Sequence, residues 1–110
     1  MEKPAVIVYE NIENKDILNE ILYGIEEEGI PYLVKRVTIE NVISASYQAA
    51  VSSPLLVGAG INDNNVSIHH AQLDKNKPLF HIDLSNVTKK DIRKCGVNTA
   101  RMVKGIAFIL

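Results

Sequence analysis

The sequence predicts an α/β fold in which helices cover a mainly parallel sheet of five strands. Two observations carry this prediction. Short apolar runs rich in β-branched residues alternate with stretches of helical periodicity through the first half of the chain, a pattern typical of parallel strands joined by helices. Later, one strand follows another with room only for a turn, so it should run antiparallel to its neighbour. The length of 110 residues suits one domain spanning 1–110.

The first strand and the first helix have the clearest local patterns. Residues 5–9 (AVIVY) form a short apolar run that predicts a buried strand. A helix is expected after Asn14, because apolar residues recur at helical spacing and form one stripe. That stripe comprises Ile17, Leu18, Ile21, Leu22 and Ile25. Gly29 and Pro31 predict its end.

The middle of the chain continues the alternation and then breaks it. Residues 32–37 predict a second strand, residues 40–51 a second helix and residues 55–58 a third strand. The segment GAGINDNN, residues 58–65, has the Gly, Asn and Asp content of a hairpin turn. A fourth strand over residues 66–70 should therefore pair antiparallel with the third.

A fifth strand and a long helix complete the predicted fold. The strand covers residues 78–83, and the helix covers about 88–104. The inner face of this helix is expected to comprise Ile92, Cys95, Thr99, Ala100 and Val103. The small residues on this face should allow close packing on the sheet.

Composition excludes several classes of protein. The formal net charge of −1 argues against a general nucleic-acid or membrane binder. No apolar run approaches the ~20 residues of a membrane span, and the N-terminus lacks the features of a signal peptide. Cys95 is the single cysteine, so no internal disulfide forms and no cysteine pair holds zinc. Together these features predict a cytoplasmic protein.

The candidate catalytic motifs are weak. GAG at 58–60 follows a strand as a phosphate loop would, but the helix that should follow it is absent. His69 and His70 are adjacent on a strand and point to opposite faces, while His69 or His81 could be satisfied by a neighbouring strand. Cys95 falls on a buried face, where cysteine behaves as a small hydrophobe. We therefore expect no catalytic residue and no cofactor in the isolated chain, and neither ATP hydrolysis nor tight cobalamin binding.

The acidic run Glu26–Glu28 ends the first predicted helix, where the helix macrodipole disfavours negative charge. Helical geometry places Glu27 nearly opposite the apolar stripe and Glu28 close to its edge. Two interpretations stay open. The run is either a solvated face that aids solubility, or an acidic patch for a cation or a basic partner.

Charge is also segregated along the chain. Residues 2–28 hold eight of the thirteen acidic residues, and residues 75–104 hold eight of the twelve basic residues. The basic residues of the last helix are Lys89, Lys90, Arg93, Lys94, Arg101 and Lys104. This helix therefore presents either a solvated face or a docking face for an acidic partner.

Three segments resemble a known family. GIEEEGIPY at 24–32, SSPLLVG at 52–58 and NTARMVKGIAF at 98–108 are similar to segments of the small subunit of diol and glycerol dehydratase reactivating factors. The resemblance implies an anticodon-binding-domain-like fold: three layers, α/β/α, with a five-stranded mixed sheet of order 2-1-3-4-5 and strand 4 antiparallel. Ala107 departs from the family pattern, in which a proline is expected.

The resemblance also implies a function. Such factors are chaperones that reactivate adenosylcobalamin-dependent dehydratases by subunit exchange, which lets damaged cobalamin leave. Their large subunit is an ATPase that binds ATP or ADP. The family's middle glutamate, here Glu27, reaches a Mg²⁺ ion held by the large subunit. The partner-binding residues implied are Glu26, Glu27, Glu28, Arg101 and Lys104.

Three other functions stay open from the sequence. The chain could be a structural medium-type subunit of the dehydratase itself, although such a subunit should be longer. It could be a small RNA-binding module, although its basic helix lacks interleaved Tyr or Trp. It could also be a flavodoxin-like enzyme, which the missing phosphate loop disfavours. Whether the client is a glycerol or a diol dehydratase stays open, as does an association with a bacterial microcompartment.

Overall fold

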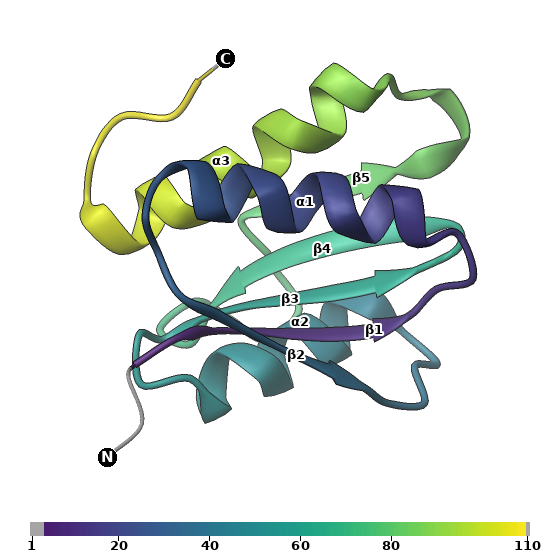
Figure 1. The fold of residues 1–110 in the computed structure, drawn as a ribbon. Helices are drawn as coiled ribbons and strands as arrows, with labels where there is room; N and C mark the ends of the chain where they lie inside the picture. Colours follow the sequence, from purple (N-terminus) through teal and green to yellow (C-terminus); the bar gives the residue numbers. More distant parts are fainter. Residues whose placement is uncertain (1–3, 110) are drawn as a thin grey trace.

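A computed structural model describes residues 4–109 as a sheet between two layers of helices (Figure 1). The strands are β1 (Val6–Asn11), β2 (Tyr32–Arg36), β3 (Val57–Asn62), β4 (Asn65–His70) and β5 (Phe80–Asp83). The helices are α1 (Lys15–Glu27), α2 (Val42–Ser52) and α3 (Lys89–Lys104), with a short 3₁₀ turn at Leu84–Asn86.

The sheet has the order β2-β1-β3-β4-β5. β1 pairs in parallel with both β2 and β3, whereas β4 is antiparallel to β3 and to β5. α1 and α3 cover one face of the sheet, and α2 covers the other (Figure 1). The expected three layers, strand order and antiparallel fourth strand are therefore confirmed.

Helix α1 begins and ends where its sequence predicts. The Asn14 side chain caps its start by accepting a hydrogen bond from the Asp16 N–H at 3.1 Å. Gly29 has a positive φ of 75°, and its N–H donates to the Glu26 carbonyl at 2.9 Å. This left-handed glycine terminates the helix. The predicted apolar stripe packs into the core.

Strand β3 differs from its prediction, because it starts at Val57 and runs to Asn62 instead of covering 55–58. Gly58 and Gly60 therefore lie inside the strand, although glycine disfavours strands. A Cβ at Gly58 would lie 2.2 Å from the Ala50 nitrogen of α2, so only glycine lets α2 pack this closely.

The predicted hairpin forms, but its turn is shorter than residues 58–65. Asn62 and Asn65 belong to the strands, and the turn consists of residues 63–64. The Asn62 side chain accepts hydrogen bonds from the N–H groups of Asn64 and Asn65 at 2.9 and 2.8 Å. The other predicted helices and strands begin and end within two residues of their expected bounds.

Helices α1 and α3 touch at two glycines. A Cβ at Gly24 would lie 2.4 Å from the Arg93 carbonyl oxygen, and a Cβ at Gly96 would lie 2.0 Å from the Ile21 carbonyl oxygen. The small residues of α3 thus serve its contact with α1 as well as its contact with the sheet. This contact fixes the distance between the outward faces of the two helices.

Helix α3 matches its prediction closely. Thr88 and Asp91 form a capping box at its start, and Gly105, with φ 69°, follows its end. Four residues of its expected inner face are buried, and Val103 is partly buried. Gly96, Val97 and Asn98 are buried as well, because α1 and the C-terminal segment cover further sides of the helix.

The face of the sheet under α2 is more polar. Ser46 of α2 and Ser67 of β4 share a hydrogen bond of 2.8 Å. His69 of β4 is fully buried and makes a T-shaped ring contact with Tyr47 of α2, with the ring centres 5.1 Å apart. Its Nδ1 accepts a hydrogen bond from the His70 N–H, and its Nε2 lies 3.2 Å from the Lys75 carbonyl oxygen. His69 is therefore satisfied in the core by His70 at the end of its own strand and by the loop after β4, and not by a neighbouring strand.

Candidate functional site

The acidic run divides into residues with different environments. Glu28 follows α1, and its side chain is only 15% exposed. Its Oε1 lies 3.2 Å from Arg101 Nε and 3.1 Å from Lys104 Nζ. The hydrogen bond from Lys104 lowers the pKa of Glu28, and the charge of Arg101 adds to this effect. The structure therefore brings together three of the residues assigned to the partner-binding surface.

The basic side chains of α3 also supply charge that α1 lacks. The last turn of α1 contains no basic residue. Lys104 donates from Nζ to the Glu28 carbonyl oxygen at 3.0 Å, next to the C-terminal end of α1. A cation in this place compensates the partial negative charge of a helix C-terminus. This contact offsets the local cost of the acidic run.

Glu26 and Glu27 are both exposed, and the exposure of Glu27 is the one that its spacing from the apolar stripe predicts. Glu26 accepts a hydrogen bond from the Tyr32 hydroxyl at 3.4 Å. The Glu27 side chain is 55% exposed, and its Oε2 lies 3.9 Å from Arg93 Nη1. Of the acidic run, Glu27 thus presents its carboxylate to solvent beside a cation of α3.

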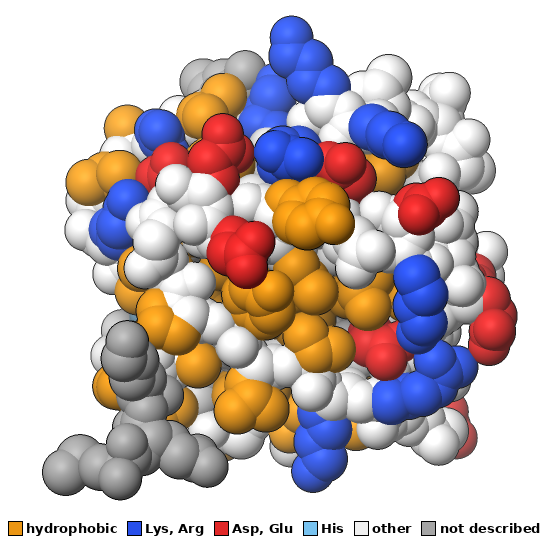
Figure 2. Space-filling view, viewed as in Figure 1, with side chains coloured by type: hydrophobic (Ala, Val, Ile, Leu, Met, Phe, Trp, Pro, Cys, Tyr) orange, Lys and Arg blue, Asp and Glu red, His pale blue; other side chains and the backbone are white. Residues whose placement is uncertain are grey.

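The segregated charges meet across the α1–α3 contact. Arg93 pairs with Glu20 at 2.9 Å, and Arg101 and Lys104 pair with Glu28. Figure 2 shows basic and acidic side chains side by side over this part of the surface. The acidic residues near the start of the sequence and the basic residues near its end therefore form ion pairs in the folded chain.

Arg101 also contacts the C-terminal segment. Its Nη1 donates to the Ala107 carbonyl oxygen at 3.0 Å. Proline has the same carbonyl, so the alanine at this position keeps the acceptor that the contact requires. Next to it, the Asn98 side chain donates to the Ile109 carbonyl and accepts from the Ile109 N–H.

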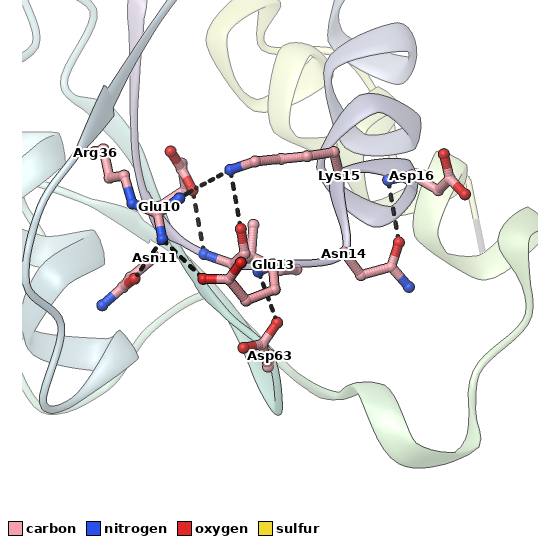
Figure 3. A network of polar contacts seen from close by, with 9 residues as sticks. Glu10, Asn11, Glu13, Asn14, Lys15, Asp16, Arg36 and Asp63 are labelled. Carbon is pink, nitrogen blue, oxygen red and sulfur yellow. Dashed lines mark hydrogen bonds and ion pairs between the residues drawn. The ribbon is translucent and has the colours of Figure 1, made fainter.

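Glu10 is a buried acid that our sequence reasoning did not single out (Figure 3). It is 5% exposed, and its Oε1 accepts hydrogen bonds from the Ile12 N–H at 3.1 Å and Lys15 Nζ at 3.2 Å. Arg36 Nη1 lies 3.5 Å from the same oxygen. Burial raises the pKa of Glu10, but these contacts outweigh it and the net pKa is lowered. Alternation with the buried Val6 and Val8 would have placed Glu10 on the inner face of β1.

Replacing Glu10 with glutamine should reduce stability in a pH-dependent way. At pH 7 we expect a loss of about 1–2 kcal/mol, because the half-exposed Lys15 and Arg36 lose their shared carboxylate. A lowered folded pKa stabilises the protein above the unfolded pKa, ~4.3, and that contribution disappears as pH falls through the folded pKa. Urea unfolding of both proteins from pH 7 to pH 3 measures this. A difference that stays constant over the range would refute the assignment.

Cys95 is buried, and burial raises the pKa of its thiol to about 12. Because the thiolate is the reactive form, Cys95 should not react with a thiol reagent at pH 8 in the folded protein, and should react fully in urea. Mass spectrometry after alkylation measures this. Rapid native labelling would show that the helix face around Cys95 opens.

Curated relatives and a family model identify the chain. A family model described as dehydratase medium subunit matches residues 3–109. The chain belongs to that family. It is 36% identical to the propanediol dehydratase-reactivating factor small subunit of Salmonella typhimurium, over 96% of this chain and 90% of that one. It is 40% identical to the diol dehydratase-reactivating factor small subunit of Klebsiella michiganensis, over 81% and 70% of the two chains. The resemblance stated from three segments is confirmed.

Two solved structures share the fold of this member of the dehydratase medium subunit family. One is a diol dehydratase-reactivating factor complexed with ADP and Mg²⁺, with a TM-score of 0.91, 35% identity and coverage of 99% of this chain and 100% of that one. The other is a glycerol dehydratase reactivase, with a TM-score of 0.92, 26% identity and coverage of 98% of each chain. The fold therefore matches reactivase chains over nearly its full length.

The exposed carboxylate of Glu27 has the chemistry of a single Mg²⁺ ligand. Among residues 4–109, no group of three or more His, Cys, Asp or Glu side chains is placed to hold a metal. Glu27 offers an exposed carboxylate, and Mg²⁺ prefers such oxygen ligands and commonly takes only one or two from protein carboxylates.

Within residues 4–109, no helix has the length and hydrophobicity needed to span a membrane.

Proposed function

We propose that this chain is the small subunit of a two-subunit chaperone that reactivates an adenosylcobalamin-dependent diol or glycerol dehydratase. The observation that carries the proposal is the nearly full-length match to curated reactivating-factor small subunits. Its partner is a large subunit, which binds ATP or ADP and hydrolyses ATP. The small subunit contributes binding surfaces and no catalytic residue.

Subunit exchange is the proposed mode of action. The family model that matches this chain is described as a dehydratase medium subunit, so the chain has the fold of a protein that the dehydratase itself contains. A chain of this fold can take the place of that subunit, loosen the enzyme and let damaged cobalamin leave. The proposed place of action is the cytoplasm, where an unpaired thiol such as Cys95 stays reduced.

The surface proposed to face the large subunit is the end of α1 together with the adjoining end of α3. There Glu27 supplies one carboxylate oxygen to Mg²⁺ held by the large subunit, and the bound ion links the two chains electrostatically. Glu26, Glu28, Arg101 and Lys104 surround Glu27 as the rest of the contact surface. Support comes from the exposure of Glu27 and from the ion pairs that hold Glu28 between Arg101 and Lys104.

Co-expression with the large subunit from the same genome tests the proposal. We expect both chains to elute together in size-exclusion chromatography, with Mg²⁺ strengthening the complex. The alternative, a structural medium-type subunit, is favoured by the description of the family model. This alternative predicts that the chain copurifies with active dehydratase and does not bind the large subunit. That result would replace the proposal.

A further inference from the structure

Arg93 of α3 reaches across to one outward stripe of α1. Its Nε donates to Glu20 Oε2 at 2.9 Å, and its Nη1 lies 3.9 Å from Glu27 Oε2. Its guanidinium carbon lies 5.4 Å from the centre of the Tyr23 ring, which it covers. Glu20, Tyr23 and Glu27 share a face of the helix because they are spaced three and four residues apart. Three groups of α1 therefore fix the position of one cation.

The Glu27 carboxylate approaches Arg93 through Oε2, which lies 3.9 Å from Arg93 Nη1, and the side chain is 55% exposed. A carboxylate that ligates a metal through one oxygen is commonly held by a hydrogen bond in its outer shell, and this partner orients the ligand. Arg93 lies beside Glu27 at an ion-pair distance of 3.9 Å, longer than a hydrogen bond, so it acts on this carboxylate through its charge.

A cation next to a metal ligand would normally repel the metal. Here Glu20 lies closer to Arg93 than Glu27 does, at 2.9 Å against 3.9 Å, and offsets its charge. Glu20, Arg93 and Glu27 together carry a formal charge of −1. The site can therefore still attract a divalent cation while the guanidinium restricts the carboxylate.

We propose that Arg93 is a positioning residue for Glu27. Anchored by Glu20 and the Tyr23 ring, it holds Oε2 so that Oε1 faces the large subunit. The inference rests on the proposed function, because it assigns Arg93 a role only if Glu27 meets a metal ion in the partner. It adds Glu20, Tyr23 and Arg93 to the residues that matter for assembly.

The test measures heterodimer affinity with and without Mg²⁺, using the purified large subunit. The readout is the ratio of the dissociation constant without Mg²⁺ to that with Mg²⁺. Arg93→Gln should lower this ratio about tenfold, as expected for loss of an outer-shell partner. Glu20→Gln should also lower it, because Arg93 loses its anchor. Arg93→Lys keeps the charge beside Glu27 and should retain most of the ratio.

Arg101→Gln is the matched control, because it also removes an ion pair between α3 and α1 but leaves Glu27 untouched. It should leave the ratio unchanged, whatever it does to affinity itself. Suppose that Glu27→Gln abolishes the Mg²⁺ dependence as expected. The inference about Arg93 is then overturned if Arg93→Gln has the same ratio as the unchanged protein, or if Arg93→Lys lowers the ratio as much as Arg93→Gln does. A normal ratio for Glu27→Gln would instead refute the proposed ligand role.

Discussion

Replacing Gly96 with alanine is expected to destabilise the protein by about 3 kcal/mol, the upper part of the range for overpacked sites. The new Cβ would lie 2.0 Å from the Ile21 carbonyl oxygen, and main-chain atoms cannot move aside as a flexible side chain can. Helix propensity acts in the opposite direction, since alanine in a helix is favoured over glycine by about 1 kcal/mol. The steric clash should exceed this gain. Urea unfolding monitored by circular dichroism measures the difference.

Lys90→Ala is the control, because Lys90 is exposed on the same helix and its replacement should change stability by no more than about 0.5 kcal/mol. Gly24→Ala, on the other side of the contact, should be destabilising for the same reason as Gly96→Ala. An unchanged or raised stability for Gly96→Ala would mean that α1 and α3 do not touch through their main chains.

Glu27→Gln should weaken assembly with the large subunit in Mg²⁺ by about tenfold or more, comparable to the loss of a metal-site residue. Glutamine keeps the shape of the side chain but removes the charge that a divalent cation requires. The stability of the free chain should stay within about 0.5 kcal/mol, because the Glu27 side chain is 55% exposed and its ion pair is long. Titration of the large subunit with and without Mg²⁺ measures this effect.

Glu26→Gln is the control, since Glu26 is the adjacent exposed acid and has no proposed ligand role. It should leave the Mg²⁺ dependence of assembly intact. Equal losses for both variants, independent of Mg²⁺, would mean that the acidic run acts only as diffuse charge.

Much of the fold could be predicted from local patterns. The period of α1, its Asn14 cap and its Gly29 end are all local features, and the structure has each of them. The same holds for the hairpin between β3 and β4, because a strand directly after a strand admits only an antiparallel pair. The order of the sheet was not derivable in this way and came from the family resemblance.

Contacts between distant residues could not be read from the sequence. Gly58 and Gly60 looked like turn residues because glycine disfavours strands, yet α2 lies so close that β3 requires them. The need for glycine at Gly24 and Gly96 could not be predicted either, because it arises from the contact between α1 and α3. Each is explained by a second segment of the chain, which single-sequence patterns do not reveal.

The candidate site shows the same division. Periodicity placed Glu27 outward and Glu28 near the apolar edge, and both placements are confirmed. Glu28 pairs with Arg101 and Lys104, which lie more than seventy positions away in the sequence. The acidic and basic faces could therefore be predicted separately, but the ion pairs between them could not. The ligand role of Glu27 came from the resemblance and stays a prediction.

Reactivation of an inactivated dehydratase tests the central claim most directly. Glycerol and diol dehydratases from the same organism, inactivated during turnover, are incubated with ATP, Mg²⁺ and fresh adenosylcobalamin. This chain and the large subunit are added separately and together, and recovered activity is measured. We expect recovery only when both are present, and the client that recovers identifies the natural substrate class. Full recovery with the large subunit alone, unchanged when this chain is added, would contradict the assignment of this chain as the small subunit of a reactivating factor.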